Sequence, residues 1–260
     1  MNVSIIIPVS TYNLEFLLHT AANLKQYNIT YIVQSDESVA TALEATGHKI
    51  IRLWQLNHKL KCNSPKILNQ LIGIFANKDA DLFIFIDADV LTTKRDIEIL
   101  IDTIESGADV ATGCRECVEP PMLTSWSLLS KKVGVYGGLF AVRSEWLYRH
   151  AIHSLRTAEA DDWHVDQVAR ATGTKIHFTT AKAICKEKSI INFLASQYSW
   201  LHLYRPNLYL ALFCLELILL FIPIKFVLIL IKTRNIKLAL STIPLQFIII
   251  FCSLKAIRKP

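Results

Sequence analysis

The stretch LFIFIDADVL, residues 82–91, puts two acids directly after an apolar run. Leu82 to Ile86 has the pattern of a strand that is buried on both faces, so Asp87 and Asp89 should follow its carboxyl end. Two carboxylates one residue apart can reach the same cation, and oxygen ligands of this kind suit Mg²⁺ or Mn²⁺. A turn explains the triplet equally well if Asp89 caps the next helix and Asp87 binds backbone amides.

Strands and helices are expected to alternate on both sides of this stretch. Hydrophobic periodicity predicts strands at residues 3–9, 30–33, 49–53, 82–86 and 108–112, and helices at residues 14–24, 40–46, 65–76 and 94–106. This alternation predicts an α/β fold with a mostly parallel sheet flanked by helices. The carboxyl ends of such strands open into a binding crevice, and both QSDES (34–38) and DAD (87–89) fall there.

The pattern changes from residue 134 onward, because glycines precede the next strand. GVYGGLFAVRSEWL, residues 134–147, predicts a strand and the start of a helix. EADDWHVDQVARATGTKIHF, residues 159–178, predicts a helix that ends at Gly173 and then a further strand.

Residues 201–260 differ from the rest of the chain in charge and hydropathy. They hold eight Lys and Arg against the single acid Glu216, a net charge of +7, which leaves −1 of the total +6 for residues 1–200. The apolar run at 208–231 is long enough to span a bilayer, and the run at 238–254 is marginal. We therefore expect a domain at residues 1–206 and membrane-associated helices at residues 207–260. The expected partner is an anionic membrane surface and not nucleic acid.

The N-terminus favours a cytosolic location for the domain, because MNVSIIIPV is too short an apolar stretch for a signal peptide. If both C-terminal runs span the membrane, the basic loop KTRNIK (232–237) lies on the opposite side, against the positive-inside tendency. A single re-entrant or interfacial segment that is broken near Pro223 removes this conflict. Both topologies stay open.

Six segments, in their order and approximate spacing, resemble the family 2 glycosyltransferases of the GT-A fold. These segments are VSIIIPV, YIVQSDES, NSPKILNQLIG, LFIFIDAD, GGLFAVRSEWL and ADDWHVDQVARATGTKI. NSPK and DAD are most similar to relatives that glucosylate ceramide or related membrane lipids. The resemblance covers about residues 3–206. It implies a metal-dependent, inverting transfer of a sugar from a nucleotide-sugar, a UDP-sugar, to an acceptor hydroxyl, with a lipid as the expected acceptor.

The resemblance also implies tasks for single residues. Asp89 matches the metal ligand, and Asp87 matches the acid that orients the sugar or ribose and reaches the same divalent cation, Mn²⁺ or Mg²⁺. Contacts to the nucleotide-sugar are implied for Pro8, Asp36, Lys66, Asp87, Gly137, Gly138 and Arg143. Structural alternatives exist, because Asp36 can form a turn, Lys66 can be an ordinary solvated helix residue, and a plain turn also favours glycine.

Asp161 and Asp162 match the acid pair that the family has at a helix start, with Asp162 as the base that takes the acceptor proton. A neighbouring acid raises the pKa of a carboxyl group toward the range that a general base needs. Acids at a helix N-terminus are also favoured by the helix dipole without any catalytic task.

The last motif of the family is incomplete in this chain. Relatives carry Gln or Arg, two further residues and then Arg-Trp, whereas SQYSW, residues 196–200, has Ser199 in place of the arginine. The resemblance implies that Gln197 and Trp200 bind the acceptor. The missing arginine supports an alternative, a degenerate membrane-bound scaffold of the same fold. A nucleotidyltransferase is a third hypothesis, but PVSTYNLEF (8–16) lacks the glycine-rich, basic phosphate loop that such enzymes usually need.

Overall fold

The computed structural model describes residues 1–10, 12–56, 60–119, 134–186 and 221–257, together with single residues between 191 and 210. Contacts divide the chain into two compact units. Unit 1 comprises Met1–Arg115 and Lys132–Ile184, and unit 2 comprises Glu116–Lys131 and Cys185–Pro260. The domain boundary at residue 206 stays a prediction, because most of residues 187–220 lies outside the described part of the chain.

A sheet of eight strands forms the centre of the fold, in the order β3-β2-β1-β4-β7-β6-β8-β5. Neighbouring strands from β3 to β4 run parallel, and β7 is antiparallel to both β4 and β6. The prediction of an α/β fold with a mostly parallel sheet is confirmed. The strands are β1 Val3–Val9, β2 Asn28–Val33, β3 Lys49–Arg52, β4 Leu82–Ile86, β5 Val90–Leu91, β6 Val110–Glu119, β7 Leu139–Arg143 and β8 Ile176–Lys186.

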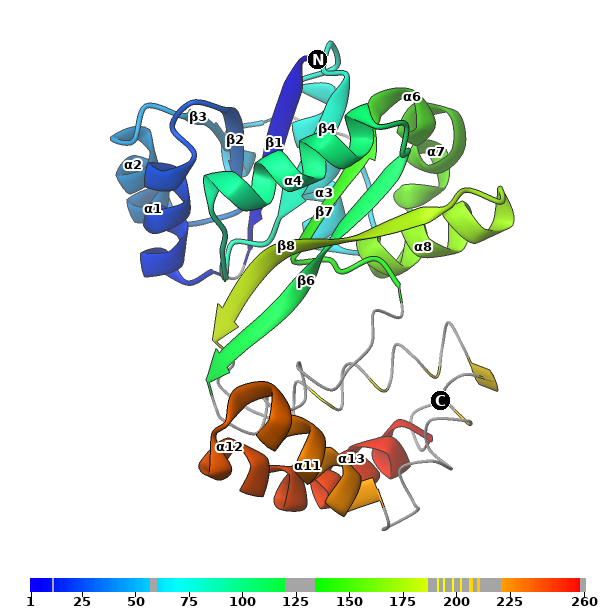
Figure 1. The fold of residues 1–260 in the computed structure, drawn as a ribbon. Coiled ribbons are helices and arrows are strands. Elements are labelled where there is room, and N and C mark those ends of the chain that lie inside the picture. Colours follow the sequence, from blue (N-terminus) through cyan, green and yellow to red (C-terminus); the bar gives the residue numbers. More distant parts are fainter. Residues whose placement is uncertain are drawn as a thin grey trace. The chain divides into compact units, whose positions relative to one another are not determined.

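Helices cover both faces of this sheet (Figure 1). On one face, α1, α2 and α4 pack against alternate strand residues such as Ile5 and Ile7. On the other face, α3, α6, α7 and α8 pack against Ile6 and Phe83. Burial of apolar side chains on both faces explains why β4 is a continuous hydrophobic run. These helices are α1 Leu14–Asn23, α2 Glu37–Glu44, α3 Pro65–Phe75, α4 Lys94–Glu105, α6 Ser144–Trp146, α7 Ile152–Leu155 and α8 Asp161–Ala171, with a 3₁₀ turn at Leu53–Gln55 and a π-helical turn at Leu147–Ala151.

Local side-chain chemistry determines where several helices begin and end. Thr93 and Asp96 form a reciprocal capping box at the start of α4. Gly173, with φ of 70°, follows the end of α8 as predicted. The predicted start of α2 at residue 40 was wrong, because Asp36 accepts hydrogen bonds from two backbone N–H groups and the helix begins at Glu37.

The strand order reverses between β1 and β4, since β2 and β3 lie on one side of β1 and β4 lies on the other. In open α/β sheets, ligands bind outside the carboxyl ends of the strands at such a switch point. Asp87 follows the carboxyl end of β4, and its backbone N–H donates to the carbonyl of Gly138 at 3.1 Å. The amino end of β7 therefore lies beside the carboxyl end of β4.

Unit 2 contains the C-terminal helices α11 Phe221–Thr233, α12 Ile236–Leu240 and α13 Thr242–Ile257. A turn at Arg234, with φ of 52°, separates α11 from α12. Within the described residues, Ile236–Ser253 is the stretch that is long and apolar enough to cross a membrane, with a mean hydropathy of 1.8 over 18 residues. A buried helix of a water-soluble protein passes the same test. The predicted apolar run at 208–231 is described fully only from residue 221 onward.

Candidate active site

Lys66 lies between two carboxylates at the switch point of the sheet. Its Nζ is 2.7 Å from Oδ1 of Asp87 and 3.1 Å from Oδ1 of Asp161. Lys66 is in the first turn of α3, Asp87 follows β4, and Asp161 begins α8. The side chains of Lys66 and Asp87 keep about a quarter of their surface exposed (26% and 29%), whereas Asp161 keeps 5%. A ligand can therefore reach Lys66 and Asp87, whereas Asp161 is buried and holds the ammonium group of Lys66 by an ion pair.

Gln70 fixes the orientation of Asp161. Its Nε2 donates to Oδ2 of Asp161 at 2.5 Å, and both side chains are buried. The two oxygens of Asp161 are thus divided between Lys66 and Gln70. Sequence reasoning missed Gln70, although it lies four residues after Lys66 and so shares one face of the helix with it.

Asp162 binds the glycine segment that leads into β7. Its Oδ2 accepts from the backbone N–H of Gly137 at 3.0 Å, and its Oδ1 accepts from the N–H of Trp163 at 2.8 Å. A Cβ on Gly137 would lie 2.7 Å from Oδ2 of Asp162, which is too close for a real contact. A side chain at position 137 would therefore force this carboxylate to move, and glycine avoids the clash.

Two further side chains hold the same segment. The hydroxyl of Thr112 accepts from the backbone N–H of Tyr136 at 2.8 Å. Asp166 is buried one helical turn after Asp162, pairs with Arg170 at 2.8 Å and accepts a backbone hydrogen bond from Val135. Asp166 was not predicted from the sequence, although its i, i+4 spacing from Asp162 places both acids on one face of α8.

The proximity of these charges shifts three pKa values. Burial raises the pKa of Asp162 to about 7, and the negative charge of Asp161 adds to this effect. Burial likewise raises the pKa of Asp87 to about 6, although Lys66 opposes the shift. Burial alone would lower the pKa of Lys66, but the carboxylates of Asp161, Asp87 and Asp162 raise it well above its usual value. Lys66 is therefore a permanent cation, and Asp162 can exchange a proton near neutral pH.

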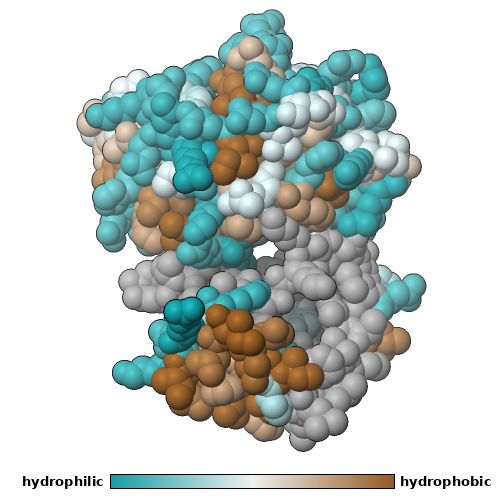
Figure 2. All heavy atoms as spheres, in the orientation of Figure 1, coloured by the Kyte–Doolittle hydropathy of each residue, from teal (hydrophilic) through white to brown (hydrophobic). Residues whose placement is uncertain are grey.

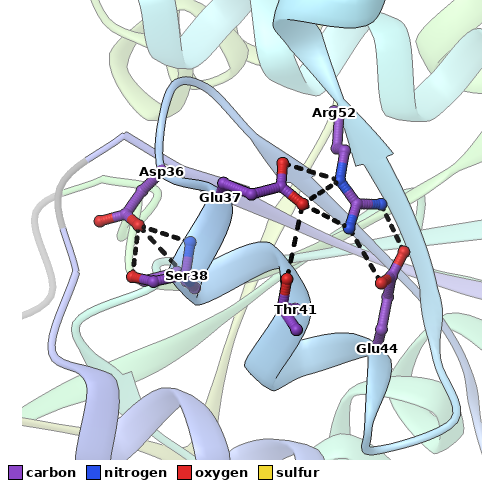
Figure 3. A network of polar contacts seen from close by, with 7 residues as sticks. Asp36, Glu37, Ser38, Thr41, Glu44 and Arg52 are labelled. Carbon is purple, nitrogen blue, oxygen red and sulfur yellow. Dashed lines mark hydrogen bonds and ion pairs between the residues drawn. The ribbon is translucent and has the colours of Figure 1, made fainter.

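Asp36 follows β2 at the same edge of the sheet, and its carboxylate caps α2 (Figure 3). Its Oδ1 accepts from the hydroxyl of Ser38 at 2.7 Å, and its Oδ2 accepts from the hydroxyl of Tyr12 at 2.5 Å. The hydrogen bond from Tyr12, followed by those from Ser38, lowers the pKa of Asp36 to about 2. The geometry accounts for Asp36 as a helix cap, and its contact with a nucleotide stays a prediction.

Arg52, at the end of β3, connects the sheet to α2 by ion pairs close to this cap (Figure 3). Its guanidinium lies between Glu37, 3.0 Å away, and Glu44, with a second bond to Glu44 of 2.9 Å. Bidentate pairing of this kind fixes the geometry of both partners. The network holds the start of α2, and with it Asp36, at the carboxyl edge of the sheet.

Asp89, the predicted metal ligand, is exposed, and within the described residues its carboxylate has no hydrogen-bond or ion-pair partner. Its negative charge contributes to the raised pKa of Asp87, so the two carboxyl groups interact. No group of three or more His, Cys, Asp or Glu side chains in the described part of the chain could hold a metal ion by itself. A cation bound by these two acids would therefore need further oxygen ligands from a substrate or from water.

The remaining predicted residues lie elsewhere. Pro8 is buried in β1 beside Ile32, near the carboxyl end of the strand. Arg143 pairs with Leu82 at the far end of β4, four residues and about 13 Å along the strand from Leu139. Its guanidinium donates to the backbone carbonyls of Ile104 and Ala108, so the structure does not bring Arg143 to the site. Gln197, Ser199 and Trp200 lie outside the described residues.

No protein-family profile matches the chain, and no curated protein matches it in sequence. Solved structures of glucosyl-3-phosphoglycerate synthase from Mycobacterium tuberculosis do match in fold. The structure with Mg²⁺ and UDP has a TM-score of 0.56 at 12% identity, covering 77% of this chain and 78% of that chain. A second structure of the synthase has a TM-score of 0.57 at 13% identity, covering 77% and 79%. A third, with Mn²⁺, UDP-glucose and phosphoglyceric acid, has a TM-score of 0.56 at 11% identity, covering 77% and 78%.

The chain has a GT-A-like fold. At this low identity the likeness shows the fold alone, and the similarity to ceramide or lipid glucosyltransferases stays a prediction. Within the GT-A-like fold, Lys66, Asp87, Gly137, Gly138, Asp161 and Asp162 gather at the switch point, where a ligand is expected.

Proposed function

We propose that the chain is a membrane-attached, inverting glycosyltransferase. It moves a sugar from a nucleotide-sugar, a UDP-sugar, to an acceptor hydroxyl on a lipid. The observation that carries this proposal is the cluster of Lys66, Asp87, Asp161 and Asp162 at the switch point, in which a fixed cation lies beside a carboxyl group with a pKa of about 7. A transferase needs both features, because it must stabilise a leaving diphosphate and deprotonate an attacking hydroxyl.

Each residue of the cluster then has a task. Lys66 contacts the diphosphate as a point positive charge, and Asp161 with Gln70 holds it in position. Asp87 orients the sugar or ribose. Asp162 accepts the proton of the acceptor hydroxyl as the oxygen attacks the anomeric carbon from the face opposite the diphosphate. A single displacement of this kind inverts the anomeric centre.

The acids fit a divalent cation, Mn²⁺ or Mg²⁺. Both Asp89 and Asp87 are accessible, and their oxygens are the ligands that these ions prefer. Such an ion would neutralise charge that develops on the leaving diphosphate. Two of the structural neighbours are complexes, one with Mg²⁺ and UDP and one with Mn²⁺, UDP-glucose and phosphoglyceric acid, which supports a UDP-sugar as donor.

The lipid acceptor and the membrane attachment rest on the C-terminal region, with the catalytic domain on the cytosolic side. The stretch Ile236–Ser253 has the composition of a membrane helix, and residues 201–260 carry a net charge of +7. Attachment would hold the crevice close to lipid headgroups. One structural neighbour is by contrast a complex with phosphoglyceric acid, a small molecule that is not a lipid.

A titration with UDP tests the donor site. We expect UDP to bind the parent protein in the presence of Mn²⁺ and only weakly without it. Asp89→Asn should abolish the Mn²⁺-dependent part, Asp87→Asn should weaken it, and the two losses should not add, because both residues serve one ion. Asp102→Asn, an exposed acid on α4, is the matched control and should bind UDP normally. If folded Asp89→Asn binds UDP with unchanged affinity in the presence of Mn²⁺, Asp89 is not a metal ligand.

A further inference from the structure

Helix α13 buries several polar side chains and exposes large apolar ones. Thr242, Gln246 and Ser253 are fully buried, at spacings of four and seven residues along one face of the helix. Ile243, Phe247 and Phe251 follow at spacings of four on the adjacent face and are exposed, with 58% of Phe247 and 54% of Phe251 accessible. These three polar side chains therefore point into unit 2, together with the apolar Leu245 and Ile249, and the two phenylalanines point out.

Helix α11 repeats the pattern. Its exposed apolar side chains lie at helical spacing: Ile224, Val227, Leu228 and Ile231. One of its two lysines, Lys225, donates to Oε1 of the buried Gln246 at 2.7 Å. Ile236 and Leu240 of α12 are exposed as well. We call these exposed residues of α11, α12 and α13 the apolar face, which is brown over the C-terminal helices in Figure 2.

Water does not favour such an arrangement. Exposed apolar patches on soluble proteins are small, and a buried polar group costs free energy unless it is hydrogen-bonded. In lipid the preferences change, because apolar side chains face acyl chains and small or polar side chains pack between helices. The pairing of Lys225 with Gln246 and the burial of Thr242 follow the second pattern.

The charges near the apolar face distinguish a lipid surface from a second copy of the chain. Lys232, Arg234 and Lys237 are exposed at the turn between α11 and α12, and the helices α11 to α13 contain no acidic residue. A symmetric pairing of two such faces would bring like charges together. Anionic lipid phosphates complement these charges instead.

We propose that α11, α12 and α13 dock on an anionic lipid bilayer, with the apolar face among the acyl chains and the basic turn at the lipid phosphates. The inference rests on the membrane attachment in the proposed function, and it assigns that attachment to the apolar face and the basic turn. The docking does not depend on glycosyl transfer, so the two claims can fail separately.

The test is co-sedimentation of the full chain with vesicles of phosphatidylcholine, with and without phosphatidylglycerol. We expect the parent to bind more tightly to the anionic vesicles. Phe247→Ser combined with Phe251→Ser should weaken binding to both kinds of vesicle by at least about tenfold, because two large apolar side chains are lost. Phe75→Ser combined with Phe178→Ser is the matched control in unit 1, where these phenylalanines are similarly exposed, and it should bind like the parent.

Arg234→Asn combined with Lys237→Gln tests the basic turn without touching the apolar face. It should weaken binding to anionic vesicles by roughly tenfold or more and leave binding to phosphatidylcholine unchanged. Lys25→Gln combined with Lys175→Gln, at exposed positions of unit 1, should have no effect.

Two results would overturn the docking. One is normal vesicle binding by the Phe247 and Phe251 variant. The other is a parent chain that ignores vesicles and forms dimers that this variant dissociates, which would make the apolar face a contact between copies. UDP affinity, measured on the same variants with Mn²⁺, should stay unchanged. A chain that binds vesicles but not UDP would refute the transferase and keep the docking.

Discussion

Asp162 shows how its neighbours can prepare one residue for a task. Its two oxygens accept from backbone N–H groups, which orients the carboxylate, while burial beside Asp161 raises its pKa to about 7. The sequence predicted the acid pair and the lysine, because Asp161, Asp162 and Lys66 belong to recognisable motifs. It did not predict Gln70 or Asp166, because their roles depend on contacts that are distant in sequence. Gln70 binds Asp161, 91 positions further along the chain, and Asp166 lies against Gly134, about 30 positions before it.

The raised pKa of Asp162 predicts a specific pH dependence. A base must be ionised to accept a proton, so the transfer rate should fall as the pH decreases through about 7. Asp161→Asn removes the negative charge that raises this pKa, so the midpoint of the acid limb should move to lower pH. Initial rates measured from pH 5 to pH 9 give the midpoint of the acid limb for the parent and for the variant. The same midpoint in parent and variant would contradict the assignment.

At the scale of elements, hydrophobic periodicity was sufficient to predict β1, β4, α3 and α4 to within one residue. The strands β6 and β8 extend several residues beyond their predicted ranges, because pairing partners far away in the sequence determine how long a strand continues. For the segment before β7, the sequence predicted only that glycines precede the strand. The hydrogen bonds of this segment to α8 and β6 hold it against the acids of the site.

Gly137→Ala tests this segment. The added Cβ would lie 2.7 Å from Oδ2 of Asp162, so the carboxylate must move and the Gly137 N–H bond must lengthen. We expect the transfer rate to fall at least about tenfold, since a displaced base loses much of its effect. Gly134→Ala, which crowds Asp166 at 3.0 Å and not Asp162, is the matched control and should lose less activity. Equal rates for Gly137→Ala and the parent would show that the close approach has no catalytic role.

At the scale of the whole molecule, the site exists because three distant segments converge. The start of α3, the end of β4 and the start of α8 meet only because β4 lies beside β1 and β7 lies antiparallel to β4. The sequence predicts the strands and their carboxyl ends, but strand order depends on long-range pairing that periodicity does not encode. The sequence motif placed Arg143 in the same binding site as Asp87. In the structure Arg143 lies at the opposite end of β7 from the segment that contacts the acids.

The most direct test of the central claim separates binding from transfer at Asp162. The full chain is mixed with vesicles of a total membrane lipid extract and with labelled UDP-glucose in the presence of Mn²⁺, and label in the lipid fraction is measured. The parent should transfer label, whereas Asp162→Asn should bind UDP as tightly and transfer about 10² to 10⁴ times more slowly. Glu159→Gln, an exposed acid three residues away, should behave like the parent. Transfer by Asp162→Asn at the parental rate would contradict the account, as would a parent chain that binds no UDP.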